Sequence, residues 1–198
     1  MTAPRSLLTM AGAPLHPSQL DRSALVVIDH QTEYTTGALP LEGADAAVTE
    51  IAALLSLARR SGVPVFHIVH HGRPGGLFDP EGPTSRIIPG VEPVDGEAIV
   101  VKRLISSFAG TDLQAHLQAS GRPELIVAGF MTHMCVSSTV RAASDLGYRV
   151  TVVAGATAPR ALPDPLGGVI PAQTVHRANL AALADRFAVV VPDHRVWG

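Results

Sequence analysis

Short runs of β-branched and other apolar residues alternate along the chain with longer segments rich in alanine and leucine. The short runs predict strands over residues 24–30, 63–70, 97–102, 124–130, 149–155 and 187–192. The longer segments predict helices over residues 44–62, 111–121, 135–147 and 172–186. In the first of these helices, apolar residues recur at the i, i+3, i+4 spacing of one buried helix face.

Strands that alternate with helices predict an α/β fold with a parallel sheet. The predicted strands are continuous apolar runs, which is typical of a sheet covered on both faces. We therefore expect a three-layer α/β/α sandwich with a six-stranded, mostly parallel, Rossmann-like sheet. A chain of 198 residues fits one such domain, over residues 21–198, preceded by a loose N-terminal arm over residues 1–20.

The composition narrows the classes of function. Apolar residues make up 46% and charged residues 16%, a balance typical of globular proteins. The net charge of −2 and the absence of a long apolar run predict no nucleic-acid partner and no membrane partner. The single cysteine, Cys135, has no second cysteine for an internal disulfide, so we expect a cytoplasmic location, where thiols stay reduced.

Several widespread catalytic motifs are absent from the sequence. No G-x-G-x-x-G turn follows the first predicted strand, which argues against a dinucleotide-dependent oxidoreductase. A serine hydrolase of the G-x-S-x-G type, a P-loop enzyme and an H-E-x-x-H metalloprotease are excluded in the same way.

Three reactive side chains follow predicted strands at their carboxyl ends. Asp29 ends the first strand, Lys102 ends the third, and Cys135 follows the fourth and opens a helix. Ligands of parallel α/β sheets bind beyond these strand ends, so we expect the three residues to form an active site there. Each has an ordinary structural explanation alone: a buried core thiol, a loop carboxylate or a solvated lysine. Their conjunction at one edge favours the site.

Each of the three residues has a chemical role in this interpretation. The helix N-terminus is expected to lower the pKa of the Cys135 thiol. Asp29 can accept the thiol proton and later help to activate water. Lys102 can hold Asp29 ionised and stabilise the thiolate. Backbone N–H groups of the turn before Cys135 can bind the oxyanion of a tetrahedral intermediate.

Three stretches resemble the isochorismatase-like cysteine hydrolase superfamily, which includes nicotinamidases, N-carbamoylsarcosine amidohydrolase, ureidoacrylate hydrolases and streptothricin hydrolases. They are ALVVIDHQTEY, VKRLISSFAGTDLQAHL and LIVAGFMTHMCVSSTVRAASDLGYRVTVV. Within the superfamily, the chain resembles the streptothricin-hydrolase-like members most. The resemblance implies a catalytic triad of Asp29, Lys102 and Cys135. It also implies a cis peptide bond between Phe130 and Met131 and an oxyanion hole formed by the amides of Met131 and Cys135.

The activity implied by the resemblance is hydrolysis of an amide, ureide or lactam through a thioester on Cys135. Members that act on isochorismate usually lack the cysteine, so Cys135 favours the amidohydrolase branch. Two alternatives stay open: an isochorismatase-type vinyl-ether hydrolase and a non-catalytic homologue that binds a small molecule. The partners implied are a small-molecule amide or ureide and further copies of the chain in a dimer or tetramer. The arm and the tail around Val196 and Trp197 are the candidate contact segments.

The resemblance also bears on metal binding. Metal-dependent nicotinamidases carry an Asp-x-His pair after the second strand, where this chain has FHIVHHGRPGG. We therefore expect no metal site and no cofactor. His67 is expected to be a core or strand-face residue, whereas His70 and His71, as neighbours on a strand, point to opposite faces. One of these two is expected to reach the pocket, together with Arg73.

Five residues near the expected site are candidate substrate-binding residues. Structural roles compete with substrate contact for most of them: Gln31 and Tyr34 can shape the pocket floor, Phe108 can belong to the core, and Thr132 can stabilise its turn. The loop over residues 71–96 is long enough for a lid or a binding loop. The candidates are Gln31, Tyr34, His70, Phe108 and Thr132.

Overall fold

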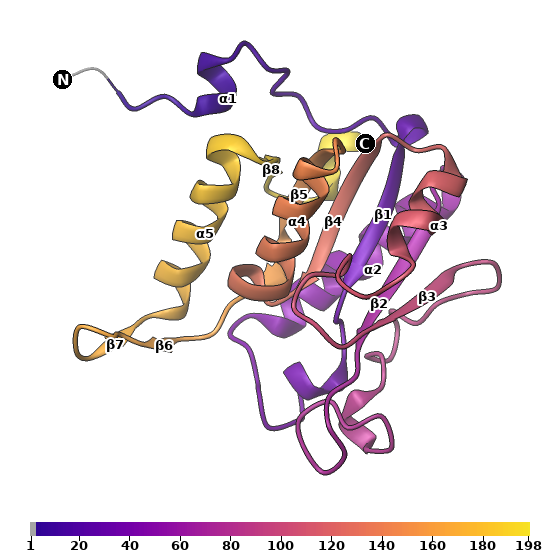
Figure 1. Ribbon diagram of the computed structural model, residues 1–198, viewed down its shortest axis with the longest axis vertical. Helices are drawn as coiled ribbons and strands as arrows, with labels where there is room; N and C mark the ends of the chain where they lie inside the picture. The colour runs from indigo at the N-terminus through magenta and orange to yellow at the C-terminus, as the bar shows by residue number, and fades with distance from the viewer. Residues whose placement is uncertain (1–2) are drawn as a thin grey trace.

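A parallel sheet forms the centre of the molecule in a computed structural model that describes residues 3–198 (Figure 1). Its six strands lie in the order β3-β2-β1-β4-β5-β8, and every neighbouring pair is parallel. Their bounds are Ser23–Ile28 (β1), Val65–His70 (β2), Ala98–Lys102 (β3), Glu124–Phe130 (β4), Arg149–Ala158 (β5) and Val189–Val191 (β8). A separate antiparallel hairpin joins β6 (Leu162–Pro163) to β7 (Val169–Ile170).

Helices cover both faces of this sheet. Residues of α2 pack against one face, and residues of α3, α4 and α5 pack against the other (Figure 1). The helix bounds are Leu7–Met10 (α1), Ala44–Arg60 (α2), Leu113–Ser120 (α3), Ser137–Asp145 (α4) and Ala172–Arg186 (α5). A π-helical turn, Thr132–Val136, precedes α4, and short 3₁₀ turns lie at Leu20–Arg22, Thr32–Tyr34, Pro83–Ser85 and His194–Trp197. The predicted three-layer α/β/α sandwich is confirmed.

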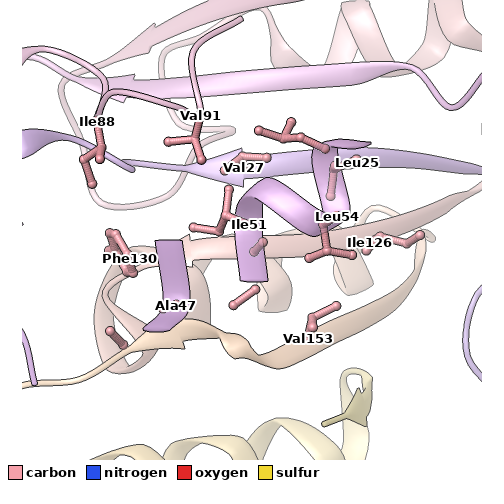
Figure 2. Close-up of a cluster of buried hydrophobic side chains, with 14 of the residues drawn as sticks. Leu25, Val27, Ala47, Ile51, Leu54, Ile88, Val91, Ile126, Phe130 and Val153 are labelled. Atoms are coloured by element: carbon pink, nitrogen blue, oxygen red, sulfur yellow. The ribbon is translucent and has the colours of Figure 1, made fainter. Parts of the chain in front are cut away.

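Two apolar cores explain why the strands read as continuous apolar runs. Along β1, Leu25 and Val27 face α2, whereas Val26 and Ile28 belong to the core under α3 and α4. Figure 2 shows the first core, in which α2 residues such as Ile51 pack onto the sheet. Successive side chains point to opposite faces of a strand, so a strand covered on both faces must be apolar at every position.

The strand order changes direction between β1 and β4. From β1 the chain builds β2 and β3 on one side, and it then returns to place β4, β5 and β8 on the other. Ligands of such sheets bind at this change of direction. Here Gly129 has φ +109°, and an added Cβ would lie 2.0 Å from the Ile28 carbonyl oxygen. Only glycine therefore lets the ends of β1 and β4 approach this closely.

The N-terminal arm is packed against the domain, whereas the sequence analysis expected it to be loose. The Leu7 N–H donates to the Asp185 carboxylate in α5, and the Ser18 N–H donates to the Thr151 hydroxyl in β5. The Trp197 indole donates to the Ser18 carbonyl at 2.7 Å, so the C-terminal tail docks on the arm of its own chain. Within residues 3–198, no helix combines the length and the apolar character that a membrane crossing requires.

Some predicted boundaries differ from the observed ones. Strand β5 was expected to end at Gly155 but continues to Ala158, because Gly155 is accommodated inside the strand, where its N–H donates to the Pro192 carbonyl. The helix predicted from Cys135 begins two residues later, after the π-helical turn. Helix α1 and the β6–β7 hairpin were not predicted, because both are too short to show a periodic apolar pattern.

Candidate active site

The three predicted catalytic residues meet at the carboxyl edge of the sheet. Asp29 directly follows β1, Lys102 is the last residue of β3, and Cys135 lies in the π-helical turn after β4. Asp29 takes a left-handed conformation with φ 48°, and its N–H donates to the Ile68 carbonyl. Asp29 and Lys102 are 0% exposed and Cys135 is 4% exposed. The structure thus brings these side chains together in a buried site.

Lys102 connects the members of this cluster. Its Nζ lies 2.7 Å from Oδ2 of Asp29 and 3.3 Å from Sγ of Cys135. The same Nζ lies 3.1 Å from Nδ1 of His70 and 3.2 Å from the Leu104 carbonyl oxygen. An ammonium has three N–H donors and no acceptor, so His70, Leu104 and Cys135 accept its three hydrogen bonds, and Asp29 is its ion-pair partner. Lys102 is also the single lysine in the sequence.

Burial dominates the electrostatics of the cluster. It raises the pKa of Asp29 to about 6, although the Lys102 charge acts against this rise. Burial and the nearby Asp29 carboxylate raise the pKa of the Cys135 thiol to about 12, again opposed by Lys102. The expected lowering of the thiol pKa is therefore wrong, because removal of the thiol from water outweighs the effect of the helix N-terminus. At neutral pH these shifts favour a protonated thiol beside an ionised Asp29.

The turn that carries Cys135 has an unusual start. The peptide bond between Phe130 and Met131 is cis, as the resemblance implied. The Met131 carbonyl accepts hydrogen bonds from the N–H groups of Met134 and Val136, which closes the turn. Met131 and Cys135 both line the cavity that opens here.

A cavity of about 310 Å³ leads to the thiol. Most of its wall is apolar or aromatic, and Tyr34 and His70 are the two candidate substrate-binding residues that line it. His71 and Arg73 are not part of this wall, so His70 is the neighbour that reaches the pocket. The lining residues are Tyr34, Leu39, His70, Leu77, Phe78, Ile105, Met131, Met134, Cys135 and Arg160.

Arg160 gives this wall a permanent positive charge that the sequence analysis missed. Within the described chain, its Nε is buried without a hydrogen-bond partner, and no carboxylate forms a salt bridge with it. Arg160 lies two residues beyond the end of β5 at Ala158, on the same edge of the sheet as Asp29, Lys102 and Cys135. A prediction that extended β5 through Gly155 would have placed Arg160 at the site.

The other three candidate substrate-binding residues do not line the cavity. Gln31 is fully buried, and its side-chain amide bonds both backbone groups of His70 and the Ser85 carbonyl. Thr132 Oγ1 lies 2.9 Å from Nδ1 of His176 in α5. Phe108 stacks on Tyr148 at a centroid distance of 6.3 Å, away from the cavity. Each is held by tertiary partners that neighbouring sequence does not reveal.

A second group of buried polar side chains, linked by hydrogen bonds, lies outside the cavity. His67 is completely buried in β2, with Nδ1 3.0 Å from Nε2 of His30 and Nε2 2.9 Å from the Glu97 carboxylate. Arg59 forms a two-pronged ion pair with the same carboxylate. His67 is thus a core residue on a strand face, as the sequence predicted. In residues 3–198, no three His, Cys, Asp or Glu side chains converge as a metal-binding group.

The fold defines an α/β protein with a candidate site at the carboxyl edge of its sheet, and the chain belongs to the isochorismatase family of hydrolases. The family model described as "Isochorismatase domain" matches residues 23–193. A crystal structure of an isochorismatase from Pseudomonas putida is 46% identical, covers 96% of this chain and 97% of its own, and superposes with a TM-score of 0.92.

Curated relatives include hydrolases with different named activities. The secreted isochorismatase effector Isc1 of Verticillium dahliae is 36% identical over 187 residues, which is 94% of this chain and 96% of that protein. A streptothricin hydrolase of Streptomyces noursei is 36% identical over 169 residues, 84% of this chain and 61% of its own length. A maleamate amidohydrolase of Pseudomonas putida is 30% identical, covering 86% and 83%. The family relatives thus include amidohydrolases.

Proposed function

We propose that this protein is a cysteine amidohydrolase that cleaves a C–N bond of a small amide, ureide or lactam. The observation that carries the proposal is the position of Lys102 Nζ, 2.7 Å from Asp29 and 3.3 Å from Cys135, beside a cavity that Cys135 lines. A base and a nucleophile that share one neighbouring cation are the groups that nucleophilic catalysis requires. The amidohydrolases among the relatives support the same reaction class.

The first half of the reaction forms a thioester. Asp29, ionised beside Lys102, takes the proton of the Cys135 thiol as Sγ attacks the substrate carbonyl. The oxyanion of the tetrahedral intermediate accepts hydrogen bonds from the amides of Met131 and Cys135. Protonated Asp29 then gives its proton to the leaving nitrogen, the C–N bond breaks, and ammonia or an amine departs.

The second half regenerates the enzyme. Ionised Asp29 takes a proton from a water molecule, which attacks the thioester carbonyl. The resulting intermediate collapses, the C–S bond breaks, and Asp29 returns the proton to Sγ of Cys135. Lys102 stabilises the negative charge on Asp29 and on the departing sulfur, since both lie within reach of Nζ.

Two other activities are tested by the same variants. A vinyl-ether hydrolase of the isochorismatase type needs an acid, which Asp29 supplies when protonated, but needs no thiol. A non-catalytic binding protein needs neither group. The thiol at the cavity wall favours the amidohydrolase, because a sulfur nucleophile has no role in the other two functions.

The test is ammonia release from a panel of small amides by the wild type, Cys135→Ser and Cys135→Ala. The wild type should release ammonia and show a mass increase on Cys135 when stopped in acid, which marks the thioester. Both variants should lose at least 10³-fold in kcat, since the nucleophile supplies the covalent route. Equal activity of wild type and Cys135→Ala would rule out the thioester route. A control variant with unchanged activity is Ser106→Ala, which removes a hydroxyl outside the cavity wall.

We propose further that the substrate carries an anionic group. Arg160 lines the cavity, its Nε has no hydrogen-bond partner among the described residues, and no carboxylate of those residues forms a salt bridge with its guanidinium. This cation therefore faces a substrate that enters the cavity. A carboxylate matches the planar fork of arginine.

Succinamate and succinamide form a matched pair for this test, because they differ in one carboxylate. The wild type should prefer succinamate, and Arg160→Gln should lower its kcat/KM by about 10- to 100-fold, mainly through KM. Arg160→Lys should retain part of the preference, since the charge remains. An equal loss for both compounds in Arg160→Gln would contradict the assignment.

We also propose a homo-oligomer, a dimer or tetramer, in a cytoplasmic setting. The side chains of Leu7, Met10 and Leu15 on the N-terminal arm are exposed and apolar, which supports the arm as a contact segment. Light scattering of the wild type and of Met10→Glu tests this. A monomeric mass for the wild type would contradict the oligomer.

A further inference from the structure

His70 is held rigidly at the wall of the cavity. It ends β2, directly across from Lys102 in the register of β2 and β3. The Gln31 side chain bonds both its N–H, at 2.8 Å, and its carbonyl, at 3.0 Å. Its ring packs edge-on against Phe78, with centroids 5.2 Å apart. Backbone and ring are therefore both fixed before any substrate arrives.

The contact with Lys102 decides which nitrogen of His70 carries hydrogen. Nδ1 lies 3.1 Å from Nζ of Lys102, and an ammonium can only donate. Nδ1 must therefore offer its lone pair, which leaves the hydrogen on Nε2. Among the described residues, Nε2 has no hydrogen-bond partner, and it is not one of the unpartnered nitrogens sealed from solvent. An unused N–H donor thus remains on a residue of the cavity wall.

The ring also stays uncharged at neutral pH. Burial, and then the charges of Lys102 and His71, lower the pKa of His70 to about 4. The Nε2–H of a neutral imidazole is too weak an acid to protonate a leaving group, and Nδ1 carries no hydrogen here. Its remaining capacity is to donate one hydrogen bond from Nε2, and this separates its role from that of Asp29.

We propose that His70 binds the substrate by donating a neutral hydrogen bond from Nε2 to an acceptor atom next to the scissile carbonyl. The assignment rests on the proposed amidohydrolase function. It narrows the substrate class to amides that present a carbonyl, carboxylate or ring-nitrogen acceptor next to the scissile carbonyl. A substrate with an N–H or a cation at that position would leave two donors facing each other, at a cost in affinity. Lys102 then has two roles, because it also sets the tautomer of a binding residue.

The tautomer can be measured without any substrate. Nitrogen-15 spectra of the histidine rings should show His70 as the Nε2–H tautomer between pH 5.5 and 8, with His70→Gln identifying its signals among the nine histidines. A neutral Nε2–H ring that does not titrate in this range is the expected result. An Nδ1–H ring, or titration near the ordinary histidine pKa of about 6.5, would overturn the proposal.

Alkylation of the unique thiol by iodoacetamide separates binding from triad chemistry, since the carbonyl oxygen of this reagent is an acceptor beside the reacting carbon. His70→Phe should lower the second-order rate constant about tenfold without moving the pH profile, and His70→Gln should recover most of it by donating from its amide. An unchanged rate, or a shifted profile in His70→Phe, would mean that His70 only orients Lys102. Failure of the proposed function is distinct: the wild type would then show an ordinary thiol profile.

Discussion

Nζ of Lys102 lies 2.7 Å from Oδ2 of Asp29, and both side chains are fully removed from solvent. An unpaired charge would be costly in this buried position, so each of the two groups stays charged only because the other carries the opposite charge. The pair lies next to the only cysteine, and Lys102 is the only lysine of the chain. Reagents and isotope labels selective for thiol or lysine therefore report directly on this site.

The alkylation of Cys135 by iodoacetamide should follow the ionisation of Asp29. Burial raises the pKa of Asp29 to about 6, and only ionised Asp29 can accept the thiol proton. The rate should be constant above pH 6 and fall about tenfold per pH unit below it. Asp29→Asn should abolish this dependence and slow the reaction, whereas Asp45→Asn, on α2, should leave it unchanged. A rate that rises only near pH 8.5 would show an unactivated thiol.

Replacing Lys102 by Met should destabilise the protein as well as inactivate it. The substitution leaves Asp29 buried without its counter-charge, which costs about 3–5 kcal/mol of the free energy of unfolding at pH 8. The double variant Asp29→Asn, Lys102→Met should regain most of this stability but no activity, because no buried charge remains. Urea denaturation of the three proteins measures the effect. Equal stability of the single and double variants would contradict the coupling.

Substituting Gly129 by alanine should disrupt the site by a steric route. Its Cβ would lie 2.0 Å from the Ile28 carbonyl oxygen, and the φ of +109° strains any side chain. We expect a loss of several kcal/mol or insoluble protein. Gly147→Ala is the matched control, since φ is +90° there but the space is open. It should cost about 1 kcal/mol. Comparable melting temperatures for both variants would show that the approach of β1 and β4 is not tight.

Acid should destabilise the fold through His30. Burial, and then the charge of His67, lower its pKa from 6.5 to about 3, so the folded state keeps His30 neutral while the unfolded chain binds a proton below pH 6.5. Its contribution is complete above pH 6.5 and is lost as the pH falls toward 3. Between pH 7 and pH 5, the wild type should lose about 2 kcal/mol more than His30→Gln. Urea titrations at both pH values test this, and parallel losses would exclude His30.

The sequence predicted what depends on nearest neighbours along the chain. Apolar runs of the right length gave all six strands of the sheet, and the rule for their carboxyl ends gave Asp29, Lys102 and Cys135. Errors arose where a residue had a distant partner. Gln31 bonds His70 and Ser85, and no local pattern reveals that its amide is consumed by the backbone of other segments.

The sequence by itself therefore determined the fold class and the three residues of the candidate site, because periodicity and strand ends are local properties of the chain. Tertiary structure alone decided the protonation of the site, since desolvation of Cys135 comes from helices and loops packed around it. It also brought Arg160 to the cavity and gave His70 its tautomer through Lys102. These properties depend on distances between segments far apart in sequence, and packing fixes those distances only when the whole sheet is assembled.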